Sequence, residues 1–279
     1  MYGDLSRPPL NEADLVRALT MGRSRWSEVT VVDASPSTNA ELAERATSDP
    51  RDGLVLLAEH QTAGRGRLDR VWLAPPRAGV TMSVLVRPAG IPLARWPWIP
   101  LLSGLAVAAA VQQVTEVRAT LKWPNDVVVD DRKLAGLLVE RVEAGDTGDV
   151  VGSSAAVIGI GLNVTTTPAE LPTPQATSLA LEAATTTDRL TLVKAILRRL
   201  EGLLAEWEAG SGVPSAGLRD AYRAACSTIG RSVRVELTGH EAVSGFAAGV
   251  DESGRLLVDT RCGRQALGAG DVLHVRRPA

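Results

Sequence analysis

A short loop rich in glycine and arginine is the part of this sequence best suited to chemistry. Gly64-Arg65-Gly66-Arg67 follows an apolar run typical of a β-strand, and Trp72 lies five residues beyond it. Glycines allow successive backbone N–H groups to turn toward an anion, and each arginine adds a charged donor fork that matches phosphate oxygens. The pattern predicts a phosphate-binding loop. A solvated turn is the alternative for so short a basic segment.

A second candidate is Lys133, which opens an apolar segment after the turn at residues 130–132. Strand alternation predicts Lys133, Ala135 and Leu137 on one face and Gly136 on the other. Lysine at a strand edge is commonly just solvated. A glycine inside a strand, however, often marks the close approach of a ligand or a second backbone. We therefore interpret Lys133 as a catalytic candidate beside a ligand.

A third candidate is the run from Ile158 to Val164, in which isoleucine, leucine and valine alternate with Gly159, Gly161 and Asn163. Alternation puts the branched residues into the core and leaves the other face as bare backbone that ends in an amide. Such a face is a flat shelf for a planar ring, and Asn163 offers both a donor and an acceptor. Glycine-rich strands also occur at bulges, which remains the structural alternative.

The elements that must position these residues alternate between strand and helix patterns, which favours an α+β fold around a mixed sheet. Strands are predicted at 29–32, 53–61, 79–87, 121–129 and 133–142, and helices at 11–21, 39–48, 100–115 and 188–209. Thr38 and Glu41 fit a capping box at the start of the second helix. After Cys226 the pattern changes to short strands near 232–238, 243–250, 255–260 and 272–276, which suit a small closed barrel. We expect residues 1–225 to form a catalytic domain, with a helical lead-in at 1–27, and residues 226–279 a second domain.

Two stretches lack periodicity. Residues 143–155 are rich in glycine, serine and aspartate and are predicted to form a solvated hairpin loop. Residues 165–178 contain three prolines and form either a connector or a lid over a ligand. Their position directly after Asn163 favours a lid.

Bulk composition narrows the class of protein. The 279 residues carry a net charge of -2, so the chain lacks the strong positive field expected of a dedicated nucleic-acid binder. The apolar stretch from 101 to 111 is shorter than the roughly 20 residues that cross a bilayer and predicts a buried helix. Two cysteines, Cys226 and Cys262, are too few for a four-ligand zinc site, and the N-terminus lacks a signal pattern. We expect a cytoplasmic protein without nucleic-acid or membrane partners, either a monomer or a weak homodimer.

Taken together, the motifs resemble those of the biotin protein ligases, which attach biotin to a lysine of biotin-dependent carboxylases. The match spans about residues 30 to 279 and is carried in order by Ser37-Thr38-Asn39 with Gln61, by Gly64 to Arg67, by Lys122-Trp123-Pro124-Asn125-Asp126, by Lys133 to Glu140 and by Ile158 to Val164. The resemblance implies a biotin/lipoate ligase fold with an SH3-like C-terminal barrel. Only about 36 residues precede Ser37, too few for a helix-turn-helix module, so the form without an N-terminal DNA-binding domain is expected.

The resemblance also implies roles for residues. Lys133 and Arg65 are expected to be catalytic, with Lys133 contacting the biotin carboxylate and the forming phosphoanhydride. Biotin is expected to meet Ser37, Thr38, Asn39, Gln61, Gly64, Arg65, Gly66, Arg67, Trp72, Lys133 and Gly136. ATP is expected to meet Arg65, Arg67, Trp72, Lys122, Asn125, Lys133 and Asn163, and Asp126 to position Mg²⁺. The implied partner is the biotin carboxyl carrier domain of an acyl-CoA carboxylase.

Two alternatives stay open. A lipoate protein ligase shares the fold and likewise activates its substrate as an adenylate. The loop from Gly64 to Arg67, here called the arginine loop, the strand at Lys133 and the C-terminal barrel follow the pattern of the biotin ligases instead. A noncatalytic biotin-binding regulator needs a pocket but not the cations Arg65, Lys122 and Lys133, whose presence favours turnover. An octanoyl transferase needs a nucleophilic cysteine near the lysine, whereas Cys226 lies far downstream.

Overall fold

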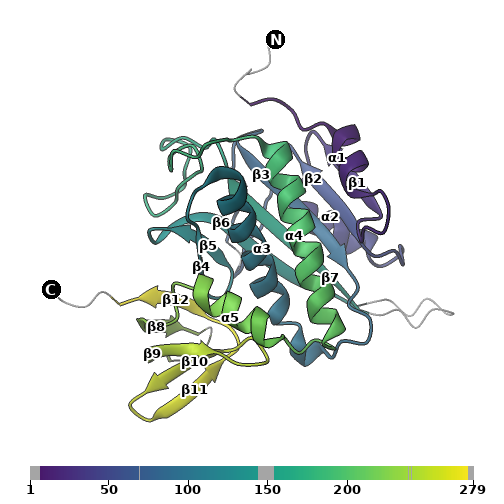
Figure 1. Cartoon of the computed structure of the whole chain (residues 1–279). Helices are drawn as coiled ribbons and strands as arrows, with labels where there is room; N and C mark the ends of the chain where they lie inside the picture. Colours follow the sequence, from purple (N-terminus) through teal and green to yellow (C-terminus); the bar gives the residue numbers. More distant parts are fainter. Residues whose placement is uncertain (1–6, 69, 144–153, 238, 240, 276–279) are drawn as a thin grey trace.

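The computed structural model describes residues 7–68, 70–143, 154–237, 239 and 241–275. Its larger part is a seven-stranded sheet in the order β1-β2-β3-β7-β6-β5-β4 (Figure 1). The first two strands are parallel, whereas the other neighbours are antiparallel, so the expected mixed sheet is confirmed. The strands are β1 (Glu28–Val32), β2 (Leu54–Ala58), β3 (Gly79–Val86), β4 (Thr120–Lys122), β5 (Asp126–Val129), β6 (Arg132–Val142) and β7 (Ala155–Asn163).

Helices cover both faces of this sheet (Figure 1). On one face α3 (Trp98–Thr115) and α4 (Arg189–Ala209) lie side by side over the main core, and α1 (Glu12–Leu19) packs near β1. On the other face α2 (Thr38–Arg45) packs over a smaller cluster around Leu42 and Val157. A further helix, α5 (Ala216–Ala225), was not predicted from the sequence. Its apolar positions Leu218 and Tyr222 are buried one turn apart.

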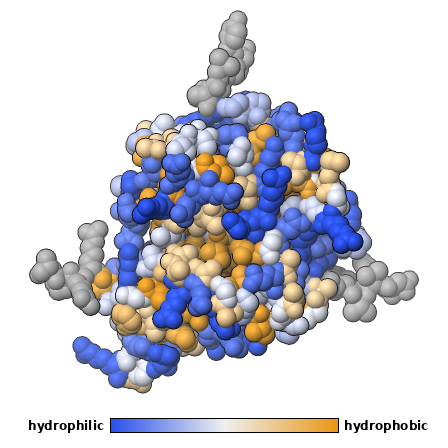
Figure 2. Space-filling view, viewed as in Figure 1, coloured by the Kyte–Doolittle hydropathy of each residue, from blue (hydrophilic) through white to orange (hydrophobic). Residues whose placement is uncertain are grey.

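The apolar helix α3 is longer than the sequence pattern indicated. Residues 93–115, which include the short helix η1 (Leu93–Arg95), are long and apolar enough to cross a membrane by length and composition alone. In the fold, 72% of that apolar window is buried inside the protein. Hydrophilic side chains cover most of the face that carries α3 and α4, with hydrophobic ones gathered near its centre (Figure 2). The helix is therefore a core helix, as expected from its alanine-rich centre.

The predicted strand 121–129 is in fact a hairpin of β4 and β5. A turn at Trp123-Pro124-Asn125 separates the two strands, and the peptide bond between Trp123 and Pro124 is cis. The turn keeps Trp123 buried, with its Nε1 donating to the Gly254 carbonyl at 3.2 Å. The apolar run alone did not reveal this reversal, because a proline at a turn and a proline at a strand end look alike in sequence.

The C-terminal part is a five-stranded antiparallel sheet in the order β11-β10-β9-β8-β12. Its strands are β8 (Ser232–Glu236), β9 (Val243–Val250), β10 (Leu256–Thr260), β11 (Gly263–Leu267) and β12 (Asp271–His274), of which β11 was missed from the sequence. Two buried tryptophans anchor it to the larger part: Trp98 Nε1 donates to the Glu252 carbonyl at 2.9 Å, and Trp123 donates to Gly254. The division of the chain at residue 225 stays a prediction.

Local details differ from the sequence expectation at two further points. The N-cap of α2 is Ser37, whose hydroxyl accepts from Ala40 N, rather than Thr38. Glu41 does not close a capping box, because its Oε1 accepts from Ser35 Oγ at 2.6 Å. The predicted solvated loop at 143–155 lies largely outside the described residues, since 144–153 are not among them.

Candidate active site

A cavity of about 610 Å³ opens where β3, β7 and β6 meet the arginine loop and the C-terminal sheet. A volume of this size fits a drug-sized molecule with a few convergent polar groups. Its lining includes all but one of the residues predicted as a site, namely Ser37, Thr38, Asn39, Gln61, Arg65, Gly66, Arg67, Trp72, Lys122, Asn125, Asp126, Lys133, Gly136 and Asn163. Gly64 is the exception: it closes the base of the loop, with its carbonyl accepting from Trp72 N.

A β-bulge positions Lys133. Val127 pairs with Ala135 but Val128 pairs with Lys133, so Leu134 is an extra residue in β6. The extra residue shifts the alternation by one position and brings Lys133 onto the same face as Gly136. A Cβ on Gly136 would lie 3.0 Å from the Lys133 Cε. The expectation that these two residues face opposite ways was therefore wrong, and the bulge aims the lysine into the cavity.

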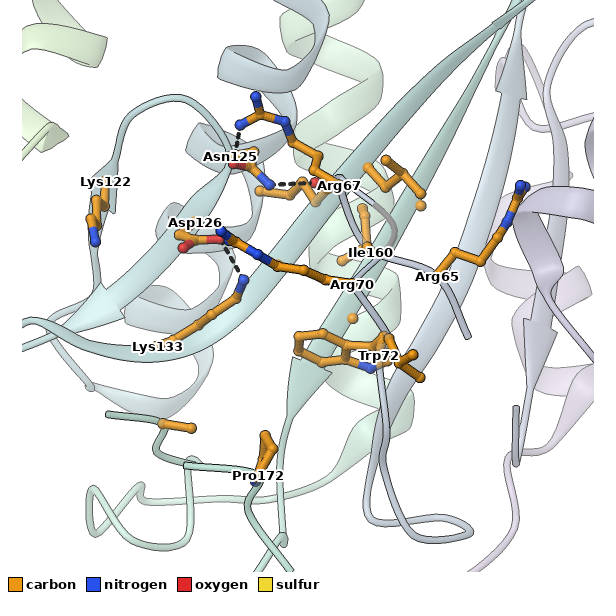
Figure 3. Close-up of a pocket in the computed structure, with 18 of the residues that line it drawn as sticks. Arg65, Arg67, Arg70, Trp72, Lys122, Asn125, Asp126, Lys133, Ile160 and Pro172 are labelled. Atoms are coloured by element: carbon orange, nitrogen blue, oxygen red, sulfur yellow. Dashed lines mark hydrogen bonds and ion pairs between the residues drawn. The ribbon is translucent and has the colours of Figure 1, made fainter. Parts of the chain in front are cut away.

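Lys133 is paired inside the cavity. Its ammonium lies 2.6 Å from Asp126 Oδ1 and 5.8 Å from the ring centre of Trp72 (Figure 3). Asp126 comes from β5 and Trp72 from the segment after the arginine loop, and the two lie on either side of the lysine. The lysine side chain is 37% exposed, which leaves its ammonium accessible to a ligand.

Trp72 covers the glycine face of β7. A Cβ on Gly161 would lie 2.3 Å from the indole ring of Trp72, and a Cβ on Gly159 would lie 2.3 Å from Asn39 Oδ1. Glycine at both positions is thus required for close approach of these side chains. The flat shelf predicted from the sequence exists, and in this structure Trp72 and Asn39 lie on it.

The arginine loop reaches three different elements. Arg65 extends away from the other cations and pairs with Glu140 at 3.1 Å, whereas Arg67 donates to Asn125 Oδ1 at 3.0 Å (Figure 3). Arg70, which the sequence reading missed, points toward Asp126 and pairs with Asp271 of β12. Burial lowers the pKa of the Arg67 guanidinium, the carboxylates of Asp271 and Asp126 oppose the shift, and Arg70 adds to it. An arginine pKa is high enough that Arg67 stays cationic at neutral pH.

Near α2 the cavity wall is neutral and tightly hydrogen-bonded. Gln61 Oε1 accepts from Thr38 N at 2.8 Å, and the Thr38 hydroxyl lies 2.7 Å from Ser83 Oγ. Ser83 in turn donates to Asn39 Oδ1 at 2.6 Å. Ser83 was missed from the sequence, although a serine inside the otherwise mostly apolar strand β3 was a usable signal.

Both the nitrogen and the oxygen of the Asn39 amide are hydrogen-bonded within the protein. Its nitrogen donates to Glu140 Oε2 at 2.8 Å and to the Leu138 carbonyl at 3.3 Å, while its oxygen accepts from Ser83. Glu140 therefore holds both Asn39 and Arg65. This geometry suits a supporting role for Asn39 behind Thr38 and Gln61.

At the opposite end, the loop after β7 forms the wall. Asn163 Nδ2 donates to the Thr177 carbonyl at 2.9 Å, so the amide that was predicted to face a nucleotide also holds this loop. Pro172 lies below Lys133 and Trp72 in the close-up (Figure 3), and Thr173, Gln175 and Ala176 line the same wall. Lys122 stands at the far edge of the cavity from Arg65 (Figure 3).

The donor set was tested against the expected magnesium ion. Within the described ranges, no group of three or more His, Cys, Asp or Glu side chains could hold a metal. Mg²⁺ at nucleotide sites commonly uses one or two carboxylates together with water and phosphate oxygens. Asp126 supplies one carboxylate beside the cations Lys133 and Arg70, so the site fits a metal that arrives with a polyphosphate.

Two family models match the chain. The model described as the biotin/lipoate A/B protein ligase family matches residues 31–163, and the model described as the biotin protein ligase C-terminal domain matches residues 228–275. The fold and the site thus define a ligase of the biotin/lipoate type.

The relatives narrow this class. The chain is 42% identical over 277 residues to a biotin--[acetyl-CoA-carboxylase] ligase from Mycobacterium tuberculosis, with 98% of each chain covered. It is 31% identical to the bifunctional ligase/repressor BirA of Escherichia coli, with 86% of this chain and 71% of that protein covered. A biotin protein ligase from Aquifex aeolicus in complex with biotin and ATP superimposes with a TM-score of 0.71 at 27% identity, covering 90% of this chain and 100% of that one. The chain belongs to the biotin protein ligase family and is an enzyme of the ligase class.

Proposed function

We propose that this enzyme joins biotin to ATP as biotinyl-5'-AMP and then transfers the biotinyl group to a lysine of a biotin carboxyl carrier domain. The observation that supports this reaction most directly is the composition of one cavity. A neutral hydrogen-bonding wall at Thr38 and Gln61 suits a ureido ring, and a cationic wall at Arg67, Lys122 and Lys133 suits a carboxylate beside a triphosphate. The Aquifex aeolicus protein, which has the same fold, is described as a complex with biotin and ATP.

In the first step a carboxylate oxygen of biotin attacks the α-phosphorus of ATP. The new P–O bond forms as the bond to the β-phosphate oxygen breaks, and pyrophosphate leaves. Both reactants are anions, so catalysis requires fixed positive charge at the point where they meet. We assign this role to Lys133, whose ammonium leaves Asp126 to contact the carboxylate and the α-phosphate, and to Arg67.

In the second step the neutral amine of the carrier lysine attacks the acyl carbon of biotinyl-AMP. An amide bond forms, the bond between the acyl carbon and the phosphate oxygen breaks, the attacking nitrogen gives up one proton to water, and AMP leaves with its negative charge near the same cations. Trp72 covers Gly161 of β7 and shields the mixed anhydride from water in this proposal. Arg65 is a further proposed catalytic residue, and its pairing with Glu140 requires a side-chain movement before it reaches a phosphate.

We propose that Asp126 holds Mg²⁺ together with phosphate oxygens of the nucleotide. When bound there, Mg²⁺ would supply positive charge to the phosphates and to the leaving group. Asp126→Asn should raise the Mg²⁺ concentration for half-maximal activity by about tenfold or more, while the Kd for biotin stays within about twofold. An unchanged Mg²⁺ dependence of biotinyl-AMP formation would remove Asp126 as a ligand.

The proposed acceptor is the carrier domain of an acyl-CoA carboxylase, because the Mycobacterium tuberculosis relative is named for acetyl-CoA carboxylase. We propose a cytoplasmic location. It is supported by the free thiols of Cys226, which is buried, and Cys262, which is exposed.

One incubation tests the reaction. The protein is mixed with ATP, Mg²⁺, radiolabelled biotin and an isolated carboxyl carrier domain, with a carrier variant that lacks the target lysine as the matched control. The ligase labels the intact carrier only. Label that stays as free biotin favours a noncatalytic regulator. A parallel incubation replaces biotin with radiolabelled lipoate, and transfer of lipoate but not of biotin favours a lipoate ligase.

A further inference from the structure

One arginine ties the segment before α1 to the loop that follows β7. Arg7 donates through Nε to Thr165 Oγ1 at 3.1 Å and through Nη2 to the Thr165 carbonyl at 2.9 Å. Its terminal nitrogens also bind both carboxylate oxygens of Glu170, at 3.1 and 2.7 Å. The planar guanidinium thus holds two points of the loop in one plane, which a lysine ammonium could not do.

The segment that carries Arg7 is itself fixed to the core. Leu10 N donates to Glu59 Oε1 at 2.5 Å, and Arg189 Nη2 donates to the Pro8 carbonyl at 2.6 Å. Glu59 and Arg189 form an ion pair of 2.6 Å in which both side chains are almost fully buried. Arg7 therefore connects the loop to a rigid anchor.

Glu170, the partner of Arg7 in the loop, is itself held by further hydrogen bonds. Glu170 Oε2 also accepts from the backbone N–H and the hydroxyl of Thr167, at 2.9 and 3.0 Å. Hydrogen bonds from Arg7 and Thr167 lower the pKa of Glu170 to about 2, so its carboxylate is ionised throughout the neutral range. The first turn of the loop is thus organised around one charged pair.

The far end of the same loop frames Lys133. Lys133 N donates to the Gln175 carbonyl at 2.7 Å, and Thr177 N donates to the Lys133 carbonyl at 2.8 Å. Pro172, between these points and the Arg7 contact, and Ala176, between Gln175 and Thr177, both line the cavity. Any movement of the loop therefore moves the cavity wall beside the lysine.

We propose that Arg7 is a positioning residue for the nucleotide, because it fixes the loop at 165–178 and with it the wall next to Lys133. The inference rests on the proposed function, and it assigns a role to a residue outside the cavity. The opposite wall, at Thr38 and Gln61, is built on α2 and the end of β2. Loss of Arg7 should consequently weaken the binding of ATP and leave the binding of biotin largely unchanged.

The test uses Arg7→Ala and Glu170→Gln in the full chain. Arg17→Ala is the matched control, since Arg17 lies on α1 with 72% of its side chain exposed and pairs with Asp14 at 3.7 Å. We expect both test variants to raise the KM for ATP in biotinyl-AMP formation by about tenfold, with the KM for biotin within about twofold. Amide exchange across residues 165–178 in the ligand-free protein should accelerate in both test variants and stay unchanged in the control.

Two results would overturn the inference. The first is a KM for ATP and an amide exchange rate within about twofold of the wild type in both variants. The second is an equal rise of both KM values together with a lower Tm, which indicates a general structural role. If the wild type forms no biotinyl-AMP, the proposed function fails, and amide exchange in the ligand-free protein still decides whether Arg7 holds the loop.

Discussion

The ammonium of Lys133 lies 2.6 Å from the carboxylate of Asp126, and the β-bulge at Leu134 makes this pairing possible. The pair keeps a cation and a carboxylate together in the cavity before substrates arrive. A phosphate or a biotin carboxylate that approaches Lys133 competes with Asp126 for the same ammonium. In the proposed function, release of Asp126 at that moment would leave its carboxylate free to hold a metal ion.

Removing the ammonium should abolish the first step. Lys133→Ala is expected to lower the rate of biotinyl-AMP formation by at least about 100-fold, because charge that is positioned for the transition state contributes several kcal/mol. Pyrophosphate release measures this step directly. The uptake of biotin, followed by calorimetry, should change far less. Near-normal pyrophosphate release from the variant would contradict the catalytic assignment of Lys133.

Adding one methyl group to the glycine face of β7 should displace Trp72. A Cβ at position 161 would lie 2.3 Å from the indole, so Gly161→Ala forces the ring outward. We expect a loss of about 1–3 kcal/mol of stability and a weaker binding of biotinyl-AMP. Tryptophan fluorescence and denaturant unfolding measure these effects.

Gly202→Ala is the control for that substitution. Gly202 lies on the exposed side of α4, and a Cβ there meets no atom within 4 Å. Alanine in place of a glycine inside a helix should stabilise by about 0.5–1 kcal/mol. Equal behaviour of the two variants would show that Trp72 does not require the bare backbone at Gly161.

The buried pair of Glu59 and Arg189 should be the most sensitive ion pair for stability. The two side chains are 4% and 5% exposed, and Arg189→Met leaves the carboxylate buried without its cation. We expect a loss of about 3–5 kcal/mol in the free energy of unfolding. Arg51→Met, at a solvent-exposed ion pair, should lower the free energy of unfolding far less. Urea unfolding measures the loss of stability in both variants. A similar loss in both would contradict the larger contribution expected of the buried pair.

Acid should weaken the contact between the C-terminal sheet and the turn before Lys133. His274 lies 3.1 Å from Asp131 and from Thr228 Oγ1. Burial lowers the pKa of His274; the Asp131 carboxylate opposes that shift, whereas Arg231 and Lys122 add to it. A histidine with a lowered pKa binds its proton more readily in the unfolded chain. Stability should therefore be complete above about pH 6.5 and fall as the pH drops below it.

The matching variant is His274→Gln, which keeps a polar side chain and does not titrate. Between about pH 7.5 and about pH 5.5, its unfolding midpoint should change less than that of the wild type. An identical pH slope in both proteins would assign the acid sensitivity to another group.

Local patterns in the sequence were sufficient to predict that the long helices and strands exist. The apolar stripe of α4 depends on neighbours within a few residues, so its bounds agree closely with the structure. The alternating run 158–164 lies in β7 apart from its last residue, but the strand begins earlier, at Ala155. The order of the glycine, arginine and lysine motifs was also enough to indicate the family, because such motifs are contiguous in the chain. The hairpin at Trp123-Pro124 escaped because its turn is held by a distant segment, with Trp123 N donating to Thr228 Oγ1. Helix α5 was missed although its N-cap, Ser215, is a local signal.

The cavity itself was decided by tertiary structure. The sequence determined which cations and amides this protein has, but the direction of Lys133 follows from a bulge that exists only because β5 pairs with β6 out of step. In the same way, Arg65 and Arg67 look equivalent in the loop, yet one meets Glu140 of β6 and the other meets Asn125 of the turn before β5. Side-chain direction depends on partners that lie far away in the chain, and only the folded protein brings those partners together.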